Sequence, residues 1–72
     1  MEKQIKIFLE DILKERGITR YELAKRTDTL YPIIDKYYKN KVVRFDREVL
    51  LRFCLALDCE IEDIIKIVTI EK

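Results

Sequence analysis

The sequence predicts an all-α fold: a single domain over residues 1–72 built from five short helices. Apolar residues recur at three- and four-residue intervals through most of the chain, which is the period of an amphipathic helix. Residues that cap or end helices stand between these apolar segments. With 49% apolar and 40% charged residues, the composition suits a compact helical domain with an ionised surface and argues against disorder.

The first helix is expected over residues 5–16, followed by Gly17 as its end. Its apolar residues fall on one face because they are spaced by three or four positions. They are Ile5, Phe8, Leu9, Ile12 and Leu13.

A second helix is expected over residues 20–27. Thr19 precedes it and Glu22 follows three positions later, which is the pattern of a capping box. Leu23 and Ala24 supply its buried side. Asp28 then marks a break, since Asp tolerates turn and left-handed backbone conformations.

The third helix is expected over residues 30–38, with Ile34 and Tyr37 facing inward. Pro32 then lies in the first turn, where its missing N–H breaks no intrahelical hydrogen bond. Asn40 suits a left-handed residue after the last turn. This helix is also the most aromatic and basic of the chain.

Two further helices are expected in the C-terminal half. Asp46 can cap a helix over residues 47–57, whose apolar stripe runs from Val49 to Leu57. Cys59 or Glu60 opens the fifth helix. Its inward face is predicted to hold Ile61, Ile64, Ile65 and Val68.

The charge is unevenly distributed although the net charge is only +1. Residues 14–47 hold ten Lys or Arg against five Asp or Glu, whereas residues 48–72 hold three against six. A basic middle segment is expected where one face of a protein meets a polyanion.

Three stretches resemble the Cro/repressor-type helix-turn-helix, or XRE family, and the similarity spans Ile5 to Ile67. They are GITRYELAKRTD, TLYPIIDKYYKNK and FDREVLLRFCLALDCEIEDII. The matching positions are Ile18-Thr19, Glu22-Leu23-Ala24, Asn40, Ala56-Leu57 and Ile64-Ile65. The chain departs from the family where Asp28, Asn40 and Asp58 stand at positions that are usually glycine. The resemblance implies a five-helix, lambda-repressor-like DNA-binding domain with its helix-turn-helix at the second and third helices.

The resemblance also implies which residues meet DNA, because in this family the third helix enters the major groove and the second crosses the backbone. The implied phosphate contacts are Arg20, Lys39, Lys41 and Arg44. The implied base contacts are Tyr31, Pro32 and Lys36. Lys36 can donate to guanine, whereas Pro32 offers only an apolar contact.

The function that follows is sequence-specific binding of double-stranded DNA by a small transcriptional regulator, a repressor in the first hypothesis. A homodimer is expected, since specific sites of this kind usually contain two half-sites about 34 Å apart. The alternative is a protein-interaction module that keeps the fold and binds a protein through the apolar LYPII segment of its third helix.

The dimer contact is predicted at Ile67 and Ile70, which are left over once the fifth helix has turned its other apolar residues inward. Two alternatives remain open at this point. The β-branched tail IVTI could form a strand paired with the same strand of a second copy. Ile67 and Ile70 could also fold back toward the first helix around Ile7.

Other classes find no support in the sequence. The chain has no histidine, no nucleophile elbow and no glycine-rich phosphate loop, so we expect neither an enzyme nor a bound cofactor. Cys54 and Cys59 supply at most half of a zinc site, and both are expected to be reduced packing residues. No membrane-spanning or signal segment is expected, which indicates a cytoplasmic location.

Overall fold

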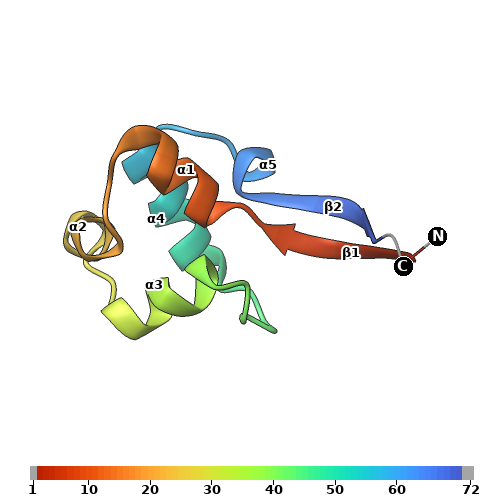
Figure 1. Cartoon of the computed structure of the whole chain (residues 1–72). Helices are drawn as coiled ribbons and strands as arrows, with labels where there is room; N and C mark the ends of the chain where they lie inside the picture. Colours follow the sequence, from red (N-terminus) through yellow and green to blue (C-terminus); the bar gives the residue numbers. More distant parts are fainter. Residues whose placement is uncertain (1, 71–72) are drawn as a thin grey trace.

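The computed structural model describes residues 2–70, which form five helices and a two-stranded sheet (Figure 1). The helices pack into one body, and the two strands extend from it side by side. In chain order the elements are β1 (Glu2–Ile7), α1 (Leu9–Arg16), α2 (Arg20–Thr27), α3 (Tyr31–Tyr38), α4 (Arg47–Leu57), α5 (Ile61–Ile64) and β2 (Ile65–Ile70).

The all-α prediction is therefore wrong at both ends of the chain. Strands β1 and β2 pair antiparallel, with Ile7 opposite Ile65 and Ile5 opposite Ile67. The first helix begins at Leu9 rather than residue 5, and the fifth ends at Ile64. Alternating Ile and Lys in both segments, together with the β-branched residues of IKIVTI, satisfies a strand better than a helix.

The sheet is fastened to the helical body at its inner end. The Asn40 side chain accepts a hydrogen bond from the Ile7 N–H (2.6 Å) and donates one to the Ile7 carbonyl (2.7 Å). The Phe8 N–H donates to the Ile64 carbonyl at 2.6 Å. An isolated two-stranded ribbon is marginal in water, so these contacts and the burial of Ile7 hold it in place.

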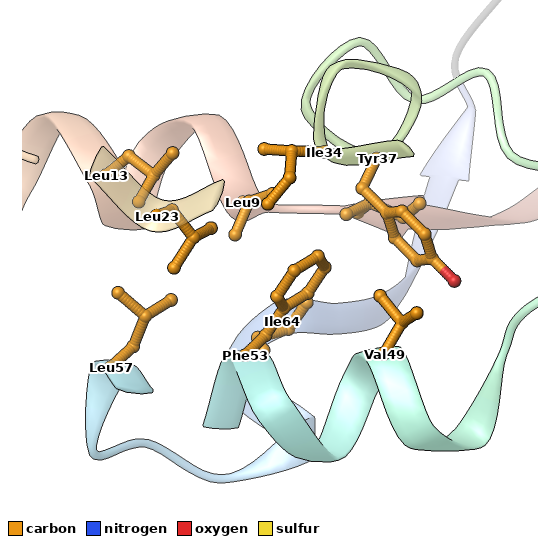
Figure 2. Close-up of a cluster of buried hydrophobic side chains, with 10 residues drawn as sticks. Leu9, Leu13, Leu23, Ile34, Tyr37, Val49, Phe53, Leu57 and Ile64 are labelled. Carbon is orange, nitrogen blue, oxygen red and sulfur yellow. The ribbon is translucent and has the colours of Figure 1, made fainter. Parts of the chain in front are cut away.

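The core lies between α4 and the other helices, with Phe53 at its centre (Figure 2). The Tyr37 ring meets Phe53 edge-on, with ring centroids 5.2 Å apart. The Tyr37 hydroxyl accepts a hydrogen bond from the Asp46 N–H at 3.0 Å, which places the start of α4. The prediction that Ile34 and Tyr37 face inward is confirmed, since both are buried.

The four longer helices share one kind of C-terminal end. A residue with positive φ follows each of these helices. It directly follows the last helical residue of α1, α2 and α4, and it stands two positions after the last residue of α3. These residues are Gly17, Asp28, Asn40 and Asp58. The next residue then donates its N–H to a carbonyl five positions earlier, as in the Schellman motif. These bonds join Ile18 to Leu13, Thr29 to Ala24, Lys41 to Lys36 and Cys59 to Cys54, at 2.9–3.1 Å.

The helix starts follow the sequence signals with one difference. The Thr19 hydroxyl accepts from the Glu22 N–H at 3.0 Å, and Asp46 caps α4 as expected. The Glu22 carboxylate, however, bonds the Arg26 guanidinium at 2.5 Å instead of returning to the backbone at Thr19. The capping box predicted for α2 is thus half formed.

Candidate nucleic-acid interface

Helices α2 and α3 pack against each other and are joined by a short turn of Asp28, Thr29 and Leu30. Asp28 takes the left-handed conformation, with φ 51°. The buried Thr27 hydroxyl donates to the Leu23 carbonyl at 2.7 Å, and the Thr29 hydroxyl donates to the Thr27 carbonyl at 3.2 Å. The turn is therefore held by its own polar groups, and it fixes α3 relative to α2.

Helix α3 presents a polar face to solvent because its apolar residues lie on the opposite face. Ile34 and Tyr37 are buried, whereas Pro32, Lys36 and Lys39 are exposed. Positions 32 and 36 are spaced by four residues, so they share one face of the helix. The predicted base contacts Pro32 and Lys36 are thus accessible together.

Lys36 on α3 lies near Lys41 and Arg44 of the loop that follows this helix, and we call these three residues the open side. They line a groove together with Ile33, Val42, Val49 and Asp46, the residue that caps α4. No residue of the described range 2–70 forms an ion pair with any of the three. Lys36 and Lys41 lie close together because the Lys41 N–H donates to the Lys36 carbonyl in the motif that ends α3.

A second group of charged residues lies where the start of α2 meets α3. Arg20 and Lys39 share one carboxylate there, and we call Arg20, Asp35 and Lys39 the paired side. Arg20 Nη1 lies 2.5 Å from Asp35 Oδ1, and Lys39 Nζ lies 3.0 Å from Asp35 Oδ2. The Arg20 guanidinium also stacks over the Tyr38 ring, 4.3 Å from its centroid, and faces Tyr31 at 5.8 Å. Arg20 therefore joins the start of α2 to two successive turns of α3.

The paired side keeps the Asp35 carboxylate ionised. The hydrogen bond from Lys39 and the nearby Arg20 lower the pKa of Asp35, against a smaller opposing effect of burial. With two cations sharing one carboxylate, this cluster contributes a single net positive charge to the surface of α3.

The structure thus divides the predicted phosphate contacts into two groups. Lys41 and Arg44 lie beside Lys36 on the open side, while Arg20 and Lys39 meet at Asp35. The pairing of Asp35 with Lys39 is the i,i+4 ion pair that a helix allows. The link from Arg20 to Asp35 was not predicted, since it joins residues on two helices and leaves no local signal.

The predicted dimer residues lie on β2 rather than on a helix. Ile67 is 70% exposed and stands opposite Ile5, which is 57% exposed. Ile70 pairs with Glu2, and it points to the other face of the ribbon because strand residues three apart face opposite ways. The tail does form a strand, but its partner in the structure is β1 of the same chain. The dimer contact itself stays a prediction.

Other kinds of site find little basis in the part of the chain that the structure describes. Within residues 2–70, no three His, Cys, Asp or Glu side chains gather where they could hold a metal ion. Over the same residues, no helix is both long enough and apolar enough to span a bilayer. The basic surface around α3 is the feature with the clearest chemical character.

A comparison with protein-family models gives a match over most of the chain. The family described as Cro/C1-type HTH DNA-binding domain matches residues 9–69, from the start of α1 to near the end of β2. No curated protein and no solved structure gives a significant match to the chain.

Proposed function

Because the chain belongs to the Cro/C1-type helix-turn-helix DNA-binding family, we propose that it is a small transcriptional regulator that binds double-stranded DNA in a sequence-specific manner. The open side supports this proposal: three cations, none of which forms an ion pair within residues 2–70, line one groove beside the exposed face of α3. Binding over a promoter would exclude other proteins from it, so repression is the expected outcome.

The phosphate contacts are proposed at Lys41 and Arg44, with Arg20 and Lys39 contributing less because Asp35 neutralises part of their charge. Each phosphate contact releases condensed counterions, so affinity should fall with salt. These contacts set the register of the protein on the duplex and do not depend on base sequence.

Base contacts are proposed at Lys36, Tyr31 and Pro32 on α3. The Lys36 ammonium can donate to guanine O6 or N7 in the major groove, and Pro32 can meet a thymine methyl group. Tyr31 is 40% exposed at the first residue of α3, where its hydroxyl can reach a base edge or a phosphate. Lys36 is therefore the residue expected to contribute most to discrimination between sequences.

Selection of bound sequences from a random duplex library tests this function. Wild-type protein should enrich one short motif, and its affinity should fall steeply with salt. A Lys3→Ala variant, which removes a positive charge from the exposed ribbon, should enrich the same motif. No enrichment, together with salt-independent binding, would contradict the proposal.

That negative result would favour the alternative, a protein-interaction module that retains the fold. The observation on its side is the exposure of apolar residues at the start of α3: Leu30 is 72% exposed and the adjacent Tyr31 is 40% exposed. Contiguous exposed apolar residues usually mark an interface. Substitution of Leu30 by Ser should leave DNA binding intact if DNA is the partner.

We also propose that two copies associate through the ribbon, since Ile5 and Ile67 form an exposed apolar pair across β1 and β2. A two-fold contact buries such a patch on both copies at once. Sedimentation of wild type should then show a dimer, and Ile67→Lys should dissociate it. Thr69→Lys is the matched control, because Thr69 lies on the same ribbon face farther from the body. A monomeric wild type at tens of micromolar, or a dimeric Ile67→Lys variant, would contradict this contact.

A further inference from the structure

The end of α4 holds two cysteines, Cys54 and Cys59, in a particular backbone arrangement. Asp58 follows the helix in the left-handed conformation, with φ 50°, and its N–H bonds the Cys54 carbonyl. The Cys59 N–H donates to the same carbonyl at 3.0 Å. This Schellman motif characteristically brings the side chains at its two ends into contact, and here those side chains are the two thiols.

The same positions at the end of α1 show what the motif ordinarily joins. There Leu13 is buried and Ile18 is partly buried, an apolar pair that closes the helix. At the end of α4 both thiols are free and partly exposed, and each thiol influences the pKa of the other. The α4 end thus combines the ordinary packing role with two partly exposed thiols.

We propose that Cys54 and Cys59 form a reversible intramolecular disulfide when the protein meets a small-molecule disulfide such as oxidised glutathione. The bond would cross the α4 end and tie the last turn of α4 to the segment between α4 and α5. It would be formed within the native backbone, because the motif has already closed the short loop between the two residues.

The exchange proceeds in two balanced steps. The thiolate of one cysteine, for example Cys54, attacks one sulfur of the external disulfide, whose S–S bond breaks and releases one glutathione thiolate. The Cys59 thiolate then attacks the Cys54 sulfur of the mixed disulfide and releases the second glutathione. The two protein thiols lose two protons and two electrons; the electrons reduce one external disulfide to two thiols.

The surroundings of the thiols set the pH range of the exchange. Burial raises the pKa of both, to about 11 for Cys59. Because the thiolate is the nucleophile, the rate of the first step should increase with pH above neutrality.

Equilibrium exchange with glutathione tests the proposal on the full chain. The protein is equilibrated with mixtures of oxidised and reduced glutathione, quenched with acid and resolved by mass, once in native buffer and once in concentrated guanidinium. The folded chain should close the disulfide with an effective thiol concentration about tenfold or more above that of the unfolded chain. By linkage, tenfold corresponds to about 1.4 kcal/mol of added stability.

Two single-cysteine variants serve as controls. Cys54→Ser and Cys59→Ser each retain one thiol, so they should form the glutathione adduct without any closed product. Circular dichroism should show that both remain folded. An effective concentration in native protein equal to or below that of the unfolded chain would overturn the proposal. So would native wild type that accumulates two glutathione adducts or intermolecular disulfides in place of the closed form.

Discussion

The open side and the paired side both carry lysine and arginine, but only the cations of the paired side form ion pairs with a carboxylate among residues 2–70. On the paired side, Arg20 and Lys39 share the Asp35 carboxylate, and Arg20 also stacks on Tyr38. On the open side, Lys36 and Lys41 lie beside Arg44 without an acidic partner among residues 2–70. Basic composition alone does not separate these two groups.

The difference indicates how a chain with a net charge of +1 can meet a polyanion. A cation that already has a carboxylate partner offers less net charge to a phosphate, whereas a solvated cation releases counterions when it binds. The paired side therefore holds α2 and α3 in position, and the open side supplies most of the electrostatic attraction. The predictions below test this division of roles.

Removal of both phosphate-directed cations from the open side should have the largest effect. In the Lys41→Ala, Arg44→Ala double variant, log K against log salt should be flatter by about two units, with a loss of roughly 100-fold at low salt. Specific and random duplexes should be affected alike. Fluorescence anisotropy at several salt concentrations measures both quantities, and an unchanged slope would remove these residues from the footprint.

Substitution of the third open-side residue should change discrimination more than attraction. Lys36→Ala is expected to cost about 1–3 kcal/mol on the preferred duplex and little on random DNA, because a lost base contact affects one sequence position. Competition binding with duplexes varied at single base pairs locates that position. An equal loss on every duplex would make Lys36 another phosphate contact.

Asn40, next to the open side, has two structural roles: a left-handed backbone conformation after α3 and a side chain that bonds Ile7. A substitution can test the second role without changing the first. Asn40→Gly keeps the left-handed conformation but deletes both hydrogen bonds to Ile7, so unfolding free energy should fall by about 1–2 kcal/mol. Asp28→Gly is the matched control, because the structure shows a left-handed Asp there without such a clamp, and its stability should change little. Urea denaturation compares the two, and equal stabilities would contradict the role of the clamp.

Release of the paired side should give the smallest effect on DNA binding, in the opposite direction. Asp35→Asn removes the carboxylate shared by Arg20 and Lys39, so binding to random DNA should tighten and the salt slope should steepen by less than about one unit. Fluorescence anisotropy at several salt concentrations measures both the affinity and the salt slope. A flatter slope would show that the Asp35 pairs position these cations for DNA.

Much of the helical body could be predicted from local signals. Gly17, Asp28, Asn40 and Asp58 all adopt the positive φ values that short polar side chains or glycine allow, and Thr19 caps α2 as expected. Apolar spacing placed the buried residues of α3 and α4. These features depend on neighbours within about five residues, so the sequence contains them directly.

The ribbon and the paired side could not be predicted in the same way. The position of Ile5 fits two patterns: the helical spacing of Leu9 and Ile12 continued toward the N-terminus, and the alternation of a strand. Its pairing with Ile67 near the other end of the chain decides for the strand. The Arg20 to Asp35 contact likewise depends on how α2 and α3 pack. Long-range pairing leaves no spacing pattern in a single sequence.

The most direct test of the central claim is a map of amide NMR shifts of the protein as a duplex carrying its selected motif is added. The account predicts that the largest changes fall within residues 31–44, at the exposed face of α3 and the open side, with small changes in α5 and in the outer part of the ribbon. Changes concentrated in α4, α5 or the ribbon, with α3 unaffected, would contradict the assignment of the DNA-binding surface to α3.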